Sequence, residues 1–150
     1  MPSPTSDEKN GGGDGTRLQG EGRDQGALGE SGWVDVSLFN ENLFRFQHLD
    51  AYRVARELAK RVHEARIRDR ELRDQATRAA KSCFLCLCEG LPNEGAALRH
   101  KYFVEARNSL AETVGAMDLA AVIGVVRQDD ADAVQALGSR LRRMLTALLR

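Results

Sequence analysis

The sequence predicts an all-α protein: an up-down-up-down four-helix bundle preceded by a disordered N-terminal tail. Apolar residues recur three and four positions apart in four segments after residue 50, which is the periodicity of one helix face. Short connections with cap and turn residues separate these segments, as antiparallel neighbours require. No segment shows the alternation of a half-buried strand. Together these observations favour a bundle over any sheet-containing fold.

The first 32 residues lack the composition of a folded domain. They hold nine of the 14 glycines and no Phe, Tyr, Trp, Ile or Val, with six acidic and three basic residues. Such a stretch cannot bury enough apolar surface to offset its ordering entropy, so residues 1–32 are predicted to be a disordered, mildly acidic tail. Residues 33–46 are predicted to be a short apolar lead-in, and 47–150 the bundle.

The first two helices are bounded by turn and cap signals. Asp50 is expected to cap a helix that ends near Ala65, and the charged connection 66–70 follows it. The second helix is expected to end at Gly90, because glycine favours the left-handed conformation after a helix and Pro92 prevents continuation.

The third and fourth helices follow the same logic. Asn93 is expected to cap a third helix, which spans Ala96 to Val126 if its pattern is continuous. The acidic pair Asp129 and Asp130 is expected to cap a fourth helix, whose apolar positions repeat to the end of the chain.

Two segments are apolar on more than one face, namely 83–88 and 115–126. A helix in a small bundle needs only one apolar stripe, so the surplus is predicted to meet another subunit. The alternative is a wholly internal core in a monomer. The predicted interface residues are Phe84, Leu85, Leu87, Met117, Val122 and Val125.

Basic residues cluster between 45 and 81, where eleven Lys or Arg accompany six Asp or Glu. Guanidinium groups fit phosphate oxygens, which favours nucleic-acid binding on one face of the first helix and the turn after it. The alternative is a solvated face in which Glu57 and Glu64 pair with neighbouring cations. The predicted binding residues are Arg53, Arg56, Lys60, Arg61, Arg66, Arg68, Arg70 and Arg73.

The remaining chemistry-bearing residues indicate structure more than catalysis. Cys83, Cys86 and Cys88 are expected to pack as small hydrophobes, because a zinc site needs four ligands and Cys88 lies off the face of the other two; a reactive thiol or a metal site are the lesser alternatives. No catalytic residue, metal or cofactor is predicted. A buried or interfacial salt bridge is expected among Arg78, Glu89, Arg107 and Glu112.

Several short motifs resemble one family. Leu49-x-x-Tyr52-x-x-Ala55, then Gln75-x-x-Arg78-Ala79-Ala80-x-Ser82 with Glu89-Gly90, and Ala106-Arg107-Asn108-Ser109 with Glu112, resemble in order the bacterial four-helix-bundle proteins encoded in 23S rRNA intervening sequences. The departures are Tyr52 for Trp, Asn108 for Gly, and Cys86-Leu87-Cys88 for Asn-Ile-Ala. The resemblance covers about residues 46–149.

The resemblance implies a homopentameric ring of bundles without established enzymatic activity, for which nucleic-acid binding has been proposed. A more distant similarity is to the accessory protein of diversity-generating retroelements, a basic pentamer that partners a reverse transcriptase. These properties are implied by the resemblance alone.

Two functional hypotheses follow. The first is a non-enzymatic oligomeric scaffold that binds structured RNA or DNA through the basic face. The second is a protein–protein adaptor ring that presents N-terminal arms, with Trp33–Phe46 engaging a partner. With no signal-peptide h-region and no apolar run of about 18 residues, we expect a cytoplasmic protein without membrane contact.

Overall fold

The structure, a computed structural model, describes residues 43–150. The tail predicted for 1–32, and residues 33–42 of the lead-in, lie outside this range. A 3-10 helix, η2 (Arg45–His48), precedes four α-helices: α1 (Asp50–Glu64), α2 (Arg70–Gly90), α3 (Ala96–Val122) and α4 (Gln128–Leu148). The predicted all-α four-helix bundle is therefore confirmed, and no strand occurs between residues 43 and 150.

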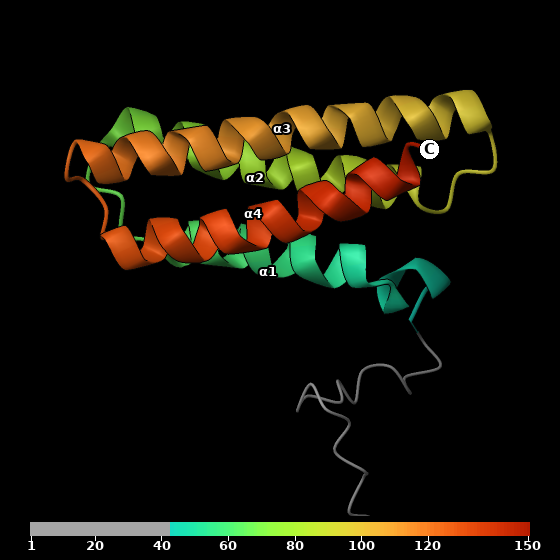
Figure 1. The fold of residues 1–150 in the computed structure, drawn as a ribbon, viewed down its shortest axis with the longest axis horizontal. Coiled ribbons are helices and arrows are strands. Elements are labelled where there is room, and N and C mark those ends of the chain that lie inside the picture. The colour runs from blue at the N-terminus through green and yellow to red at the C-terminus, as the bar shows by residue number, and fades with distance from the viewer. Residues whose placement is uncertain (1–42) are drawn as a thin grey trace, which may run out of the picture. The chain divides into compact units, whose positions relative to one another are not determined.

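The helices run up, down, up and down (Figure 1). Each helix packs against the next one in sequence, and α4 packs back against α1, so the four form a closed circuit. It follows that the side of the bundle formed by α1 and α2 is opposite the side formed by α3 and α4. The α1–α2 and α3–α4 connections meet at one end, where the Arg68 amide donates to the Val125 carbonyl at 2.9 Å.

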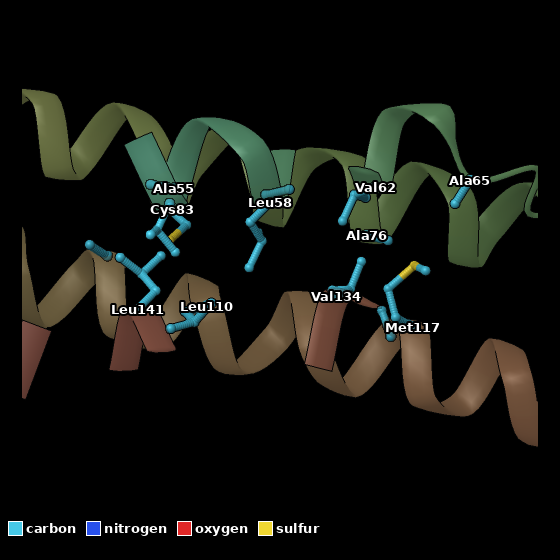
Figure 2. Close-up of a cluster of buried hydrophobic side chains, with 14 of the residues drawn as sticks. Ala55, Leu58, Val62, Ala65, Ala76, Cys83, Leu110, Met117, Val134 and Leu141 are labelled. Atoms are coloured by element: carbon cyan, nitrogen blue, oxygen red, sulfur yellow. The ribbon is translucent and has the colours of Figure 1, made fainter. Parts of the chain in front are cut away.

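The core consists of large apolar side chains from all four helices. Leu58 of α1, Leu87 of α2 and Phe103 of α3 are at most 1% exposed, and Leu141 of α4 is fully covered. Figure 2 shows Leu58, Val134 and Met117 directed into the space between the α1–α2 pair and the α3–α4 pair. Burying a side chain of this size contributes about 1.5–3 kcal/mol, so this layer holds the bundle together.

The third helix ends four residues earlier than its apolar pattern predicts. After Val122 the chain turns through Gly124, whose φ is +74°. The Gly124 amide donates to the Ala121 carbonyl and the Val125 amide to the Ala120 carbonyl, both at 2.9 Å. This is a Schellman motif, which satisfies the last free carbonyls of the helix and needs glycine at the left-handed position.

Gly90 has a different role from the one expected. It is the last residue of α2, and the capping residue Leu91 remains right-handed with φ −60°. A Cβ on Gly90 would lie 2.6 Å from Cε1 of Phe103. The glycine therefore allows α3 to approach α2 closely, and it does not end the helix through a left-handed turn.

The helix starts also differ in detail from the expectation. Asp50 is the first residue of α1 and not its cap, which is Leu49. Asp69, by contrast, caps α2, because its Oδ1 accepts from the Leu72 amide at 2.8 Å. Helices α3 and α4 begin after Gly95 and Arg127, and neither of these residues makes a side-chain cap bond.

Candidate nucleic-acid interface

The predicted basic residues lie along α1 and around the α1–α2 connection. Seven of the eight are exposed, and the side chain of the eighth, Arg53, is 29% exposed. Helix periodicity sets this arrangement, because positions three and four apart share the side of α1 opposite its buried residues. The structure thus places the set at the surface, where a polyanion can reach it.

Half of this set is engaged in ion pairs. Arg61 Nε lies 2.9 Å from Glu57 Oε1, and Lys60 Nζ lies 3.9 Å from Glu64 Oε1, which are two of the pairings expected from the spacing. Arg53 pairs with Asp50 at 3.7 Å, and Arg70 pairs with Asp74 at 3.9 Å. Exposed pairs of this kind contribute about 0.2–1 kcal/mol each, so they reduce local charge more than they stabilise the fold.

A groove of about 570 Å³ between α1 and α2 extends the basic surface. His63 lines it from α1, and α2 contributes Arg73, Asp74, Thr77, Arg78 and Lys81. Sequence reasoning did not include Lys81 and assigned Arg78 to a salt bridge. The available signal was the spacing of Arg73, Thr77 and Lys81, which are four residues apart and therefore share one side of α2. We call His63, Arg73, Arg78 and Lys81, together with Arg56, the α1–α2 basic face.

The salt bridge expected among Arg78, Glu89, Arg107 and Glu112 is not found within the chain. None of these four residues takes part in the six ion pairs among residues 43–150. All four residues are exposed, so the prediction of a buried pair is wrong. Glu112 instead accepts from the Gln75 side-chain amide, and Arg78 donates to Gln75 Oε1 at 3.0 Å. Whether these groups pair across a subunit interface stays a prediction.

Glu89 interacts with a phenol and not with an arginine. The negative charge of Glu89, some desolvation and a hydrogen bond between the two side chains raise the pKa of Tyr102 above its usual value. Glu89 on α2 therefore faces Tyr102 on α3, which supports a structural role for this carboxylate.

The predicted subunit interface divides into buried and exposed residues. Leu87 and Met117 are 0% and 1% exposed and belong to the core of the single chain, so their assignment to an interface is wrong. Phe84 and Val125 are partly buried, and the Phe84 ring lies 5.3 Å from the ring of Tyr52. The apolar pattern alone did not distinguish side chains that pack between neighbouring helices of one chain from side chains that are exposed.

Two predicted interface residues do point outward. Leu85 is 56% exposed and Val122 is 76% exposed. Leu119 and Ile123, which sequence reasoning did not list, are 49% and 53% exposed near the end of α3. Leu119, Val122 and Ile123 form what we call the α3 apolar patch. Singly exposed leucines are common in monomers, but a cluster of three marks a candidate contact surface.

The cysteines lie in surroundings that disfavour the thiolate. Burial, reinforced by the nearby Cys86, raises the pKa of Cys83 to about 12. Desolvation likewise raises the pKa of Cys86 and Cys88. Because the thiolate is the nucleophile, these thiols are expected to react slowly. Within residues 43–150, no group of three or more His, Cys, Asp or Glu is arranged to hold a metal ion.

Comparison with known families gives one match. The model of a family described as 23S rRNA-intervening sequence protein matches residues 47–147, a span that begins before α1 and ends within α4. A search of curated proteins found no significant match. Separately, none of the helices in residues 43–150 is both long enough and apolar enough to cross a membrane.

Proposed function

Because the chain belongs to the 23S rRNA-intervening sequence protein family, we propose that it is a non-enzymatic oligomeric scaffold that binds structured RNA or DNA through its α1–α2 basic face. The observation that carries this proposal is the groove between α1 and α2. Three of its six lining residues are Arg or Lys and only one is acidic. That acid, Asp74, is already paired with Arg70.

The charge of this face is available to phosphate groups. Arg56, Arg73 and Lys81 are exposed and take part in none of the ion pairs formed within residues 43–150. Each phosphate neutralised by such a side chain releases condensed counterions, which adds affinity at low salt. A ring of subunits repeats the face and multiplies this contribution.

Self-association is proposed from the placement of the exposed apolar residues. Cys86 Sγ lies 3.8 Å from Glu105 Oε2, so Leu85, one residue before Cys86 on α2, lies at about the level of residue 105 along the bundle. From there Val122 is about 25 Å further along the helix at 1.5 Å per residue. The exposed Leu85 and the α3 apolar patch, which lie at separate levels of the bundle, suit a head-to-tail interface, and such an interface forms a ring where the rotation between subunits closes. We propose a homopentamer in the cytoplasm.

Salt-dependent binding tests the nucleic-acid proposal. Fluorescently labelled hairpin RNA and duplex DNA are titrated with the full chain between 50 and 300 mM salt. For Arg56→Glu with Arg73→Glu, we expect at least a tenfold weaker affinity for the site on this face and a shallower salt slope. The control, Arg99→Glu with Lys101→Glu, makes the same charge change at the start of α3. Equal losses for both pairs, or binding that ignores salt, would count against a specific face.

A second function, a protein–protein adaptor, is favoured by one feature. It lies where α1 begins and α2 ends, at the end of the bundle opposite the α1–α2 connection. Phe44 is 71% exposed and stacks on Phe46 with ring centroids 5.7 Å apart. Beside them lies a hollow of about 590 Å³, lined also by Leu49, Leu91 and Pro92. Under this alternative, Trp33–Phe46 engages a protein partner. A purified partner that still binds after deletion of residues 1–46 would exclude the arm.

A further inference from the structure

A second basic surface lies on the other side of the bundle. Residues 133–150 contain four arginines and no acidic residue, whereas the first turns of α4 hold Asp129, Asp130 and Asp132. Helix α4 is therefore acidic where it begins and basic over its second half. Arg142, Arg143 and Arg150 line hollows on the side of the bundle formed by α3 and α4. Because that side is opposite the side formed by α1 and α2, these three arginines are separate from the α1–α2 basic face.

Two of these arginines, Arg142 and Arg143, border a groove and the hollow next to it. A cavity of about 560 Å³ lies between α3 and α4, flanked by Arg107 of α3 and Arg142 of α4, and none of its lining residues is acidic. An adjoining hollow of about 520 Å³ shares Ser139 and Arg142 with it and adds Arg143. We call Arg107, Arg142 and Arg143 the α3–α4 arginine face. Its two hollows form one continuous strip along α4.

Glycines shape the floor of this groove. Gly138 is buried, and a Cβ on it would lie 2.6 Å from Cγ2 of Val114, so the two helices approach closely here. Gly115 faces open space, since a Cβ on it would meet nothing within 4 Å. The groove is therefore unobstructed, and Gly115 is a position where a side chain can be added without disturbing the core.

The charge on this face is not neutralised by any ion pair among residues 43–150. Arg107, Arg142 and Arg143 are exposed, and the six ion pairs of the described chain include none of them. On α1, in contrast, Lys60 and Arg61 each have a carboxylate partner. Three exposed guanidinium groups without an ion-pair partner among the described residues are available to an anionic ligand.

The helix dipole does not explain these arginines. Cations near a helix C-terminus are favourable, but the effect falls off within the last turn. The last turn of α4 contains no basic residue, and Arg142 and Arg143 lie before it. Their placement is therefore not accounted for by the dipole of α4.

We propose that the α3–α4 arginine face binds the sugar–phosphate backbone of a second nucleic-acid segment, so that each bundle holds two segments on opposite sides. This inference rests on the proposed function and adds a bridging role to it. Guanidinium forks suit phosphate oxygens, while Asn108, Gln135 and Ser139 in the same groove offer donors and acceptors to base edges or ribose hydroxyls.

Stoichiometry tests the proposal independently of subunit number. The full chain, at a concentration far above the dissociation constant, is titrated with a labelled ten-nucleotide RNA and, separately, with DNA of the same sequence. We expect two oligonucleotides per chain for the wild type and one for Arg107→Glu with Arg142→Glu. One per chain is also expected for Arg56→Glu with Arg73→Glu, and none when all four changes are combined.

The outcomes separate the two proposals. If Arg56→Glu with Arg73→Glu leaves binding unchanged while Arg107→Glu with Arg142→Glu abolishes it, the α1–α2 proposal fails and the α3–α4 site stands. One oligonucleotide per wild-type chain, unaffected by Arg107→Glu with Arg142→Glu, overturns the α3–α4 site. A stoichiometry that is the same for RNA and DNA indicates backbone recognition, and a second site filled by RNA but not by DNA indicates contact with the ribose hydroxyl; both support the site.

A crosslinking experiment locates the second segment directly. A photoreactive benzoylphenylalanine replaces Gly115, where the added side chain has room. Crosslinks to labelled RNA, lost upon adding Arg107→Glu with Arg142→Glu, support the proposal. Crosslinks between protein chains in place of RNA would show that a second copy covers the groove, and would overturn it. An acidic peptide that displaces the RNA at equal concentration would overturn it as well.

Discussion

Helices α1 and α3 complete the same core but present different outward faces. On α1 the outward residues are charged, and Glu57, Lys60 and Arg61 are joined in ion pairs with neighbours one turn away. On α3 the outward side ends in Leu119 and Val122, which are 49% and 76% exposed. Helix α1 therefore needs no further cover, whereas α3 leaves apolar area exposed to solvent.

The largest expected effect contrasts the inner face of α1 with the outer face of α3. Leu58 is fully buried, so Leu58→Ala is expected to lower the free energy of unfolding by about 2–5 kcal/mol. Leu119→Ala removes the same atoms from a half-exposed site and is expected to cost less than half as much. Urea unfolding measures both. Equal losses, independent of protein concentration, would show that the outer face of α3 is core.

The next effect concerns assembly. Val122→Asp places a charge in the α3 apolar patch, where each buried valine-sized side chain contributes about 1.5–3 kcal/mol to association. We expect a lower molar mass by light scattering with unchanged helical circular dichroism, and the same for Leu85→Asp. The control is Ala97→Asp, which adds the same charge at the start of α3. An unchanged molar mass for Val122→Asp would contradict the proposed difference between the outward faces of α1 and α3.

A third effect tests the inner side of α3 where α4 approaches. Gly138→Ala is expected to lower the free energy of unfolding by about 1–3 kcal/mol, because the new Cβ overlaps a stiff β-branched side chain, Val114. Val114→Ala in the same protein should remove most of this loss by clearing the space. If Gly138→Ala is neutral on its own, the helices have more freedom to separate than this contact indicates.

The sequence was informative about α1 for a physical reason. Its apolar positions Ala51, Ala55, Leu58 and Val62 form one stripe, its other face is charged, and the buried residues include all four. A helix with one apolar stripe has only one way to face a core. The fold class and the exposed position of the basic residues followed from the same reasoning.

The sequence was less informative about α3 because its apolar residues surround it. Met117 and Val122 look alike in the pattern, yet one is buried and the other is exposed. Which of the two is buried depends on which side of α3 is covered by α2 and α4. The α3–α4 arginine face was missed for a related reason: Arg107 and Arg142 are distant in sequence, and the packing of α3 on α4 brings them to one groove.

A smaller effect, of opposite sign, is expected at Gly115 on the open side of α3. Glycine within a helix costs about 0.8–1 kcal/mol relative to alanine, and Gly115→Ala meets no neighbour within 4 Å. The free energy of unfolding should therefore rise by about 0.5–1 kcal/mol in urea. A loss of stability would indicate that a second subunit approaches the helix backbone at this position.

The smallest effect belongs to the charged face of α1. Glu57→Gln removes the 2.9 Å ion pair between Glu57 and Arg61, whose side chains are 40% and 54% exposed, respectively. Exposed pairs one helical turn apart contribute about 0.3–0.5 kcal/mol to the free energy of unfolding. The loss should vanish at 1 M salt, because screening removes most of the attraction between exposed charges. Since the substitution also frees Arg61, nucleic-acid binding should strengthen slightly at low salt. A loss above about 1 kcal/mol that persists in high salt would mean that the outward face of α1 is packed, and would remove the contrast with α3.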